Sequence, residues 1–442
     1  MDRRKFLGMC LKGGVSMAAL TQLQLQAFQG STAIDDGDYK ALVCVFLSGG
    51  NDSLNMLVPL EGEARSLYES SRQNLAIAEP LTLAPETSQE GGVGLHNSLA
   101  PLQNLFAEKQ LAFVTGVGSL IAPTTQQDVI NKSVPLPLHL FSHNKQQATW
   151  MYGKEQSSIN TGWGARLLER LEQAEQFGGN ISLSGMNHWQ TSVNSMPFSL
   201  STNGISQINA LSGRQERNEH VSDLFNRVLT GQKNPLGQAY GARVKASIDK
   251  TSAMNLALQE SDPIDGVFSG SVLSRRLRTI ARTISIQSQL GCKRQVFYVS
   301  MGGFDTHGDQ NRSHSSLLGQ LSQSLSEFNQ AMTYLGQQNN VTTFTMSEFG
   351  RTLTSNGNGT DHGWAGNHIV MGGAVNGGDL YGKLLTQHLN GPRDTRGGRL
   401  IPEVANEQYF ATLARWFGVP DSELVDIFPN LANFNQHTLG FI

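Results

Sequence analysis

The sequence predicts an α/β fold in which a largely parallel β-sheet is sandwiched between layers of helices, with an inserted helical or loop cap. Three observations lead to this prediction. Continuous apolar runs of strand length recur along the chain, amphipathic helical patterns lie between several of them, and acidic or histidine residues follow the runs. The chain has 442 residues, of which 38% are hydrophobic, so it is long enough for one large domain with an insertion.

Residues 1–30 are predicted to be a twin-arginine export signal. Arg3 and Arg4 are followed by Lys5-Phe6-Leu7, and a weakly apolar stretch extends from Gly13 to Leu25. We therefore expect the twin-arginine export machinery to be a partner and the mature protein to be periplasmic or secreted. The alternative is an ordinary N-terminal helix that carries two adjacent arginines by chance.

Five apolar runs are predicted to be strands. Because the runs are continuous and do not alternate with polar residues, each is expected to be buried on both faces, as the central strands of parallel sheets are. They occupy residues 41–47, 111–115, 295–300, 341–346 and 368–371.

Apolar residues at helical spacing predict helices between these strands. The pattern is clearest over residues 273–284, 317–335 and 406–417. We assign residues 38–442 to one α/β domain. The segment at about 175–265, which is rich in Ser, Asn and Gln, is predicted to form the cap.

Charge and hydropathy exclude two classes of partner. The formal net charge is −3, which argues against nucleic acid as a partner. The chain contains no stretch of 18 or more apolar residues, so we expect no integral membrane segment.

Carboxylates and imidazoles collect at the ends of the predicted strands. Ligands of open parallel sheets bind beyond the carboxyl ends of the strands, so these side chains are candidate metal ligands. Mixed oxygen and nitrogen donors suit zinc or manganese first, then iron or magnesium, and the set is large enough for one or two divalent metals. The candidates are Asp52 after the first run, Asp305 and His307 after the third, Glu348 after the fourth, Asp361 and His362 in the next loop, and His368 at the start of the fifth.

Several of these residues also have a structural interpretation. Asp52 follows Gly-Gly-Asn and could be a turn or N-cap residue. Asp305 and His307 could form a structural hydrogen bond within their loop. Glu348 could form an ion pair with Arg351.

Ser142 is the candidate nucleophile. It follows a proline-rich stretch at 135–137 and could start a helix, where the helix dipole favours anions and a developing alkoxide. A serine nucleophile needs a base or a metal to activate it, and the predicted metal site would supply that activation. The alternative is that Ser142 is only an N-cap.

The chain resembles the secreted bacterial family catalogued as domain-of-unknown-function family 1501, within the alkaline phosphatase and sulfatase superfamily. The resemblance extends over almost the whole chain. Besides the twin-arginine leader, it rests on the segments Phe46–Asn55, Gly302–His307, Ser347–Arg351, Gly359–Trp364, Ala411–Phe417 and Ile427–Asn430.

This resemblance implies an alkaline phosphatase-like fold and an exported, metal-dependent hydrolase of phosphate or sulfate esters. Ser142 would be the nucleophile, and the substrate would be a small anionic ester or a sulfated or phosphorylated glycan. A formylglycine sulfatase is not expected, because Ser142 is not followed two residues later by proline. The order of site residues is similar to that of the superfamily: Asp52, Ser142, Asp305 and His307, Asp361 and His362, then His368.

A second interpretation belongs to a different functional class. The chain could be a non-catalytic secreted binding or assembly protein that retains the fold and a partial metal site. Metal content and the effect of Ser142→Ala distinguish the two interpretations.

Overall fold

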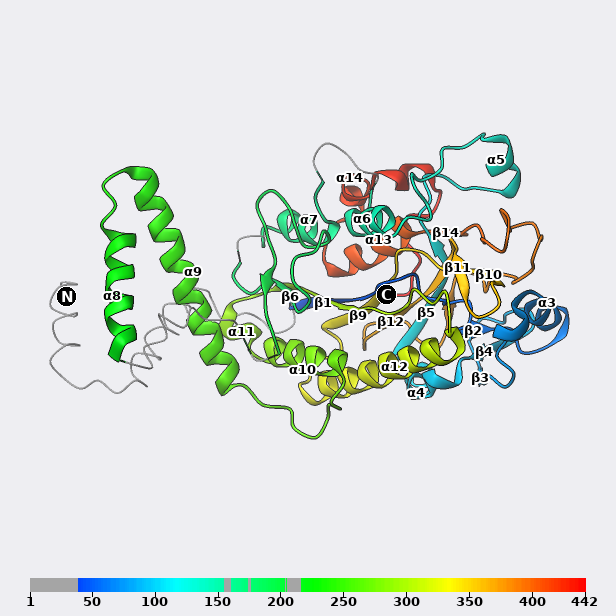
Figure 1. Cartoon of the computed structure of the whole chain (residues 1–442), viewed down its shortest axis with the longest axis horizontal. Coiled ribbons are helices and arrows are strands. Elements are labelled where there is room, and N and C mark those ends of the chain that lie inside the picture. Colours follow the sequence, from blue (N-terminus) through cyan, green and yellow to red (C-terminus); the bar gives the residue numbers. More distant parts are fainter. Residues whose placement is uncertain (1–38, 155–159, 174–175, 203, 205–215) are drawn as a thin grey trace. The chain divides into compact units, whose positions relative to one another are not determined.

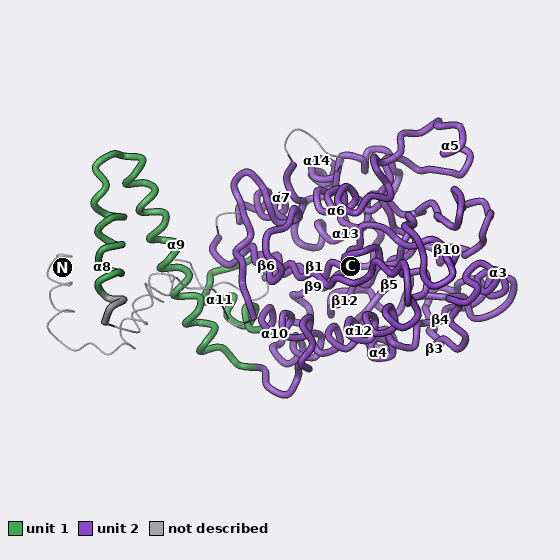
Figure 2. The backbone as a smooth tube through the Cα atoms, viewed as in Figure 1, with its two compact units in different colours: residues 1–38, 203–263, 282–293 green, residues 39–202, 264–281, 294–442 purple. Residues whose placement is uncertain are grey.

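A computed structural model describes most of the chain, in two compact units. The described residues are 39–154, 160–173, 176–202, 204 and 216–442, so the expected leader lies outside them. The larger unit contains residues 39–202, 264–281 and 294–442, and the smaller contains 203–263 and 282–293 (Figure 2).

The larger unit is built on a nine-stranded mixed sheet (Figure 1). Its strand order is β13-β5-β12-β9-β1-β8-β6-β7, and β14 also pairs with β5. The strands are β1 (Lys40–Leu47), β5 (Leu111–Gly118), β6 (Asn180–Ser182), β7 (Phe198–Ser199), β8 (Arg294–Met301), β9 (Val341–Met346), β12 (Gly366–Met371), β13 (Leu380–Tyr381) and β14 (Val404–Ala405).

Most of the strand pairs are parallel, which confirms the predicted fold class. β1 pairs with β8 on one side and with β9 on the other, both in parallel register. Every residue of β1 after Lys40 is buried, as the continuous apolar run predicts. β12 is the exception, because it runs antiparallel to both β5 and β9. Its start therefore lies at the edge of the sheet where β9 ends.

Helices cover both faces of this sheet (Figure 1). On one face lie α4 (Ala100–Ala107) and α12 (Gln310–Tyr334), and on the other lie α6 (His143–Tyr152), α7 (Trp163–Arg170) and α13 (Asn406–Phe417). The second face carries an aromatic core in which the rings of Trp163 and Phe410 stack 4.8 Å apart. Trp150 and Met151 of α6 belong to this core, which holds the helix against the sheet.

Smaller elements complete the larger unit. A hairpin of β10 (Arg351–Ser355) and β11 (Thr360–His362) follows β9, and a second sheet has the order β2-β4-β3. The remaining described strands and α-helices of this unit are β2 (Leu57–Val58), β3 (Leu81–Leu83), β4 (Val93–Leu95), α3 (Gly62–Arg72), α5 (Gln126–Asn131), α14 (Leu424–Ile427) and most of α10 (Val272–Ser285).

The smaller unit is helical. α8 (Glu216–Thr230) and α9 (Pro235–Glu260) pack against one another, and α11 (Gln287–Leu290) belongs to the same unit. Gly241 permits close packing of the pair, because a Cβ atom there would clash with the carbonyl oxygen of Leu229. Of the expected insertion at 175–265, β6 and β7 belong to the main sheet, whereas residues 203–263 belong to this unit. Among the described helices, none combines the length and the apolar character needed to cross a membrane.

Candidate metal centre

Three side chains meet beyond the ends of β8 and β9. His143 is the first residue of α6, Asp305 follows β8, and His362 ends β11. One ligand atom of each lies within 4.8 Å of the others. His143 Nε2 is 3.5 Å from Asp305 Oδ2, and His362 Nε2 is 3.3 Å from Asp305 Oδ1. We call these three residues the metal triad.

The two imidazoles of the triad are held in the same tautomer. His143 Nδ1 lies 2.9 Å from Oε1 of Glu348, and His362 Nδ1 lies 2.9 Å from the carbonyl oxygen of Phe141. An ionised carboxylate and a carbonyl can only accept hydrogen bonds, so each Nδ1 carries the proton. In the neutral imidazoles, both Nε2 lone pairs are therefore available on the side of Asp305.

A second imidazole–carboxylate pair borders the triad. His307 Nδ1 is 3.2 Å from Asp361 Oδ1, and His307 Nε2 is 3.0 Å from Asp305 Oδ1 and 3.2 Å from His362 Nε2. The side chains of His307 and Asp361 are 46% and 57% exposed, so this pair faces solvent.

Gly49 lets the strand-end loops approach one another. Its φ is +122°, and a Cβ atom there would lie 2.7 Å from the carbonyl carbon of Phe304 and closer still to the backbone nitrogen of Asp305. Its own N–H donates to Glu348 Oε1 at 2.9 Å. The glycine after β1 thus brings Asp305 and Glu348 to the same point.

A chain of hydrogen bonds between buried side chains connects Asp305 to Asp52. Arg351 Nη1 donates to Asp305 Oδ1 at 2.8 Å, and Arg351 Nε donates to the Thr360 hydroxyl at 3.1 Å. The Thr360 hydroxyl donates to Gln310 Oε1 at 2.6 Å, and Gln310 Nε2 donates to Asp52. Asp52 therefore contacts the triad only through intermediates and acts on the position of Arg351.

The charges of the site shift its pKa values in opposite directions. The hydrogen bond to Glu348 raises the pKa of His143 above its ordinary value, against the effect of partial burial. Burial lowers the pKa of His362, and the positive charges of His143 and Arg351 add to this effect. Partial burial would raise the pKa of Asp305, but the hydrogen bond and charge of Arg351 outweigh it, so this pKa is lowered. Asp305 is thus held ionised beside the imidazoles.

Of the predicted site residues, Asp305, His307, Asp361 and His362 lie together. Ser142 is next to the triad in sequence, as the N-cap residue of α6, and its side chain makes no cap hydrogen bond. Glu348 contacts the site through His143. Its carboxylate accepts the hydrogen bond that His143 Nδ1 donates, and so it orients the imidazole. The alternative Glu348–Arg351 ion pair is not formed, since Arg351 pairs with Asp305.

Two predicted ligands lie elsewhere. Asp52 is fully buried and forms an ion pair with the equally buried Arg72. His368 lies in the core, where its ring stacks on Tyr409 at 5.5 Å and contacts Trp150 at 4.9 Å. Because β12 is antiparallel, His368 does come near the correct edge of the sheet, but its side chain is only 3% exposed and packs among aromatic rings.

The sequence reasoning missed three residues of the site. His143 follows Ser142 directly, and Gln147 lies one helical turn later on the same face, where its Nε2 donates to Glu348 Oε1 at 3.0 Å. That i, i+4 spacing from His143 was a usable signal. Arg399 lay in no recognisable pattern; its guanidinium lies 4.8 Å from the centre of the Phe141 ring, and its Nε donates to the carbonyl oxygen of His362 at 3.0 Å.

The donor set of the triad fits a divalent ion. Two imidazoles and one carboxylate are a common ligand set of catalytic zinc, which keeps a further coordination position open. The side chains of His143, Asp305 and His362 are 30%, 45% and 21% exposed, so solvent or substrate can reach such a position. Arg351 occupies only the Oδ1 side of Asp305, which leaves Oδ2 for an ion.

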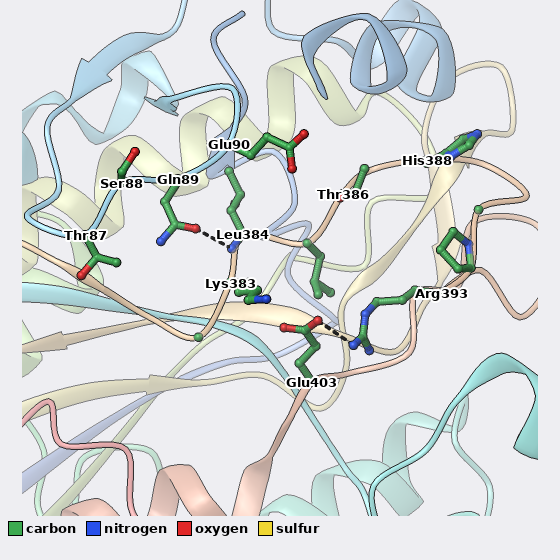
Figure 3. Close-up of a pocket in the computed structure, with 14 residues that line it drawn as sticks. Thr87, Ser88, Gln89, Glu90, Lys383, Leu384, Thr386, His388, Arg393 and Glu403 are labelled. Atoms are coloured by element: carbon green, nitrogen blue, oxygen red, sulfur yellow. Dashed lines mark hydrogen bonds and ion pairs between the residues drawn. The ribbon is translucent and has the colours of Figure 1, made fainter. Parts of the chain in front are cut away.

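Two cavities of the larger unit differ in their relation to the triad. One, of about 440 Å³, is lined by Gln147 and so adjoins the site. The other, of about 530 Å³, lies between the loops 87–90 and 382–393 and includes none of the predicted site residues (Figure 3). Within it, Arg393 and Glu403 neutralise each other in an ion pair of 2.6 Å.

The chain was compared with curated protein sequences and with solved structures. No curated protein sequence is significantly similar to it. Solved structures with a related arrangement include Ps i-CgsB in complex with k-i-k-neocarrahexaose, at 10% identity and a TM-score of 0.38 over 90% of this chain and 77% of that one. They also include the lipoteichoic acid synthase LtaP from Listeria monocytogenes, at 9% identity and a TM-score of 0.33 over 92% and 81%. Likeness at this level does not bear on activity.

The family match extends over most of the chain. Residues 39–390 of the 442 match the family described as protein of unknown function (DUF1501). This stretch includes Ser142, the metal triad and the pair of His307 and Asp361. The chain therefore belongs to the DUF1501 family.

Proposed function

We propose that this protein is an exported, metal-dependent hydrolase of phosphate or sulfate esters, with Ser142 as the nucleophile. The observation that carries the proposal is the convergence of the metal triad, with ligand atoms within 4.8 Å, at the start of α6, whose N-cap position is Ser142. A divalent ion held by His143, Asp305 and His362 would lower the pKa of a bound hydroxyl and neutralise ester oxygens.

The position of Ser142 supports its assignment. Both of its sequence neighbours contact the site: the Phe141 carbonyl accepts from His362, and His143 belongs to the triad. Its hydroxyl is not used as a helix cap and so is available for reaction. The N-terminus of the ten-residue helix α6 favours negative charge at this point.

Two further side chains are assigned roles in the proposal. His307, oriented by Asp361, would donate a proton to the leaving oxygen of the ester. Arg399, held against Phe141 and the carbonyl oxygen of His362, would attract the anionic group. The guanidinium of Arg399 matters because the chain as a whole is acidic, with a net charge of −3.

The reaction would proceed in two balanced steps. Ser142 Oγ forms a bond to the phosphorus or sulfur atom and loses its proton to solvent, while the bond to the leaving oxygen breaks and that oxygen takes a proton from His307. Water then attacks the ester on Ser142, giving phosphate or sulfate and restoring the Ser142 hydroxyl, while His307 regains from solvent the proton that it gave to the leaving oxygen. The sum is hydrolysis of one ester by one water molecule.

The ligand set supports one ion in place of two. Asp52, a predicted ligand, is already engaged in an ion pair with Arg72, and neither side chain is exposed. Removing the carboxylate from this ion pair would leave a buried guanidinium without a partner, at a cost of about 3–5 kcal/mol. We therefore assign the triad as the metal site, with zinc or manganese as the expected metal.

Metal analysis combined with ester hydrolysis tests this proposal. The chain is purified without chelator, metal is measured by mass spectrometry, and p-nitrophenyl phosphate and p-nitrophenyl sulfate are offered as substrates. We expect about one zinc or manganese ion per chain, in line with a single catalytic site. His362→Ala should lose the metal, and Ser142→Ala should keep it but fall to background hydrolysis, while the exposed control Ser66→Ala should behave as wild type.

The alternative function makes a different prediction. A non-catalytic binding or assembly protein would hold the ion but release product from neither ester, and Ser142→Ala would change nothing. Hydrolysis that survives Ser142→Ala undiminished would refute the nucleophile.

Export is proposed on the sequence alone. Replacing Arg3 and Arg4 by lysine should leave the protein in the cytoplasm, as judged by cell fractionation, if residues 1–30 are a twin-arginine signal. Export of the doubly substituted chain would contradict that assignment.

A further inference from the structure

The cavity beside Gln147 has no assigned role. It has a volume of about 440 Å³, within the range of roughly 300–1,000 Å³ typical of small-molecule pockets. Its walls come from α6, from the end of β8, and from the loop that follows β6. We call it the α6 cavity.

Gln147 connects this cavity to the metal triad. The residue lines the cavity, and its Nε2 donates to Glu348 Oε1 at 3.0 Å; the same oxygen lies 2.9 Å from His143 Nδ1. A carboxylate only accepts hydrogen bonds, so the amide nitrogen must face Glu348 and the amide oxygen stays available as an acceptor. The α6 cavity therefore begins one side chain away from a metal ligand.

The cavity offers neutral hydrogen-bonding groups. Tyr298 is 4% exposed and lines the cavity, yet its hydroxyl hydrogen-bonds to none of the described residues. Burial, with contributions from Cys44 and Glu348, raises the pKa of Tyr298, so the hydroxyl stays protonated and can donate. Ser300 uses its backbone N–H and carbonyl in bonds to Ser184 and Arg276, and its side chain is left to face a ligand.

The remaining walls combine apolar and neutral polar side chains, and the polar ones include Ser184, Asn187 and Thr191. Met151 and Met186 line the cavity, as does the imidazole of His188, whose Nδ1 is held 3.1 Å from the Tyr152 hydroxyl. No Asp, Glu, Lys or Arg is among the described residues that line it. A charged ligand part would find no counter-ion there, whereas a ring with hydroxyl groups would find donors, acceptors and apolar faces.

We propose that the α6 cavity binds the alcohol part of the ester as an uncharged, polyhydroxylated ring, such as one monosaccharide unit. This inference rests on the proposed function, in which the anionic group lies at the triad. The ester bond would then be placed between the two sites, with Gln147 at the boundary.

Binding of neutral sugars tests the inference independently of catalysis. Methyl glycosides of glucose, galactose, mannose and xylose are the probes, and saturation-transfer NMR detects them on the metal-free full chain. Because these probes carry no ester and need no metal, failure of the proposed hydrolysis leaves this test intact. We expect at least one glycoside to bind the wild type and the Ser142→Ala variant equally.

Two variants locate the bound sugar. Met186→Trp should fill the cavity and abolish the signal, whereas Met196→Trp, at a methionine of similar exposure that does not line the cavity, should leave it unchanged. Tyr298→Phe removes only the free hydroxyl and should weaken binding about 5- to 10-fold. Circular dichroism checks that each variant is folded.

Two outcomes would overturn the inference. One is that none of the four glycosides binds the folded wild-type chain. The other is that a bound glycoside is unaffected by Met186→Trp, which would place it elsewhere.

Discussion

His143 Nδ1 and Glu348 Oε1 lie 2.9 Å apart, and this contact sets which imidazole nitrogen faces Asp305. Glu348 is fully buried at the end of β9, where it also accepts from the N–H of Gly49 and from Gln147. Its position is therefore held by α6, through His143 and Gln147, and by the loop after β1, through Gly49. The fixed carboxylate in turn fixes the orientation and the tautomer of the His143 imidazole. A buried carboxylate can act on a candidate metal ligand in this way without binding the metal itself.

Glu348→Gln should weaken metal binding while leaving the fold intact. The amide preserves the shape but removes the negative charge that orients and polarises His143, and losses of about 10- to 100-fold in affinity are typical of such partners. Zinc titration against a competing chelator measures the effect. Glu69→Gln on the exposed face of α3 is the control, and an unchanged zinc affinity in Glu348→Gln would contradict the orienting role.

Asp52→Asn should destabilise the protein without changing its metal stoichiometry. It leaves the buried Arg72 without its counter-charge, which costs about 3–5 kcal/mol in the free energy of unfolding. Denaturant unfolding measures this loss, and zinc content is measured at saturating zinc. The double variant Asp52→Asn with Arg72→Met should recover part of the stability. A folded variant that binds fewer ions than the wild type would show that Asp52 is a ligand after all.

Gly49→Ala should disrupt the metal triad. The new methyl group would overlap the backbone at Phe304 and Asp305, so the loop after β8 must move. Gly62→Ala is the matched control, because Gly62 also has a positive φ, of +71°, but no atom lies within 4 Å of its Cβ position. We expect zinc content to fall only in Gly49→Ala. Equal zinc content in the two folded variants would contradict the role given to Gly49.

His368→Phe should reduce the sensitivity of the fold to acid. Burial lowers the pKa of His368 to about 3, and that of His314 to about 4, from an ordinary value of 6.5. As the pH falls below 6.5, these two histidines bind protons in the unfolded chain but not in the folded one. The free energy of unfolding therefore decreases on acidification. Each contributes up to about 1.4 kcal/mol per pH unit.

Unfolding free energies at pH 6.5, 5.5 and 4.5 measure this slope. His368→Phe should lower it by one proton equivalent and should keep its metal, whereas the exposed control His220→Phe should leave the slope as it is. Loss of metal in folded His368→Phe would mean that this histidine serves the site despite its place in the core.

Much of the fold could be predicted because a buried strand can be recognised from a short run of consecutive apolar residues. The runs at 41–47, 111–115, 295–300, 341–346 and 368–371 all appear as strands, and the helix predicted at 406–417 is α13. The predicted neighbours at the strand ends also meet, since parallel strands bring their carboxyl ends to one edge. Asp305 follows β8 directly, and His362 reaches the same edge through the hairpin that follows β9.

The rest of the site depended on contacts between distant parts of the chain. Asp52 pairs with Arg72 because the end of α3 packs beside β10 and its guanidinium reaches the loop after β1, and nothing in either segment alone specifies that pair. His368 enters the core because β12 runs antiparallel to β9 and its pleat turns the ring toward Trp150. His143 joins the site because the aromatic core holds α6 against the sheet.

The sequence by itself determined which segments are buried strands and helices, and which of them end in carboxylates and imidazoles. These are local properties, since they follow from the apolar pattern of a few consecutive residues. Only the tertiary structure decided which carboxylate meets an imidazole, which meets a guanidinium, and which nitrogen of each ring faces Asp305. Those outcomes depend on strand order, strand direction and side-chain packing across hundreds of residues, which no short segment encodes.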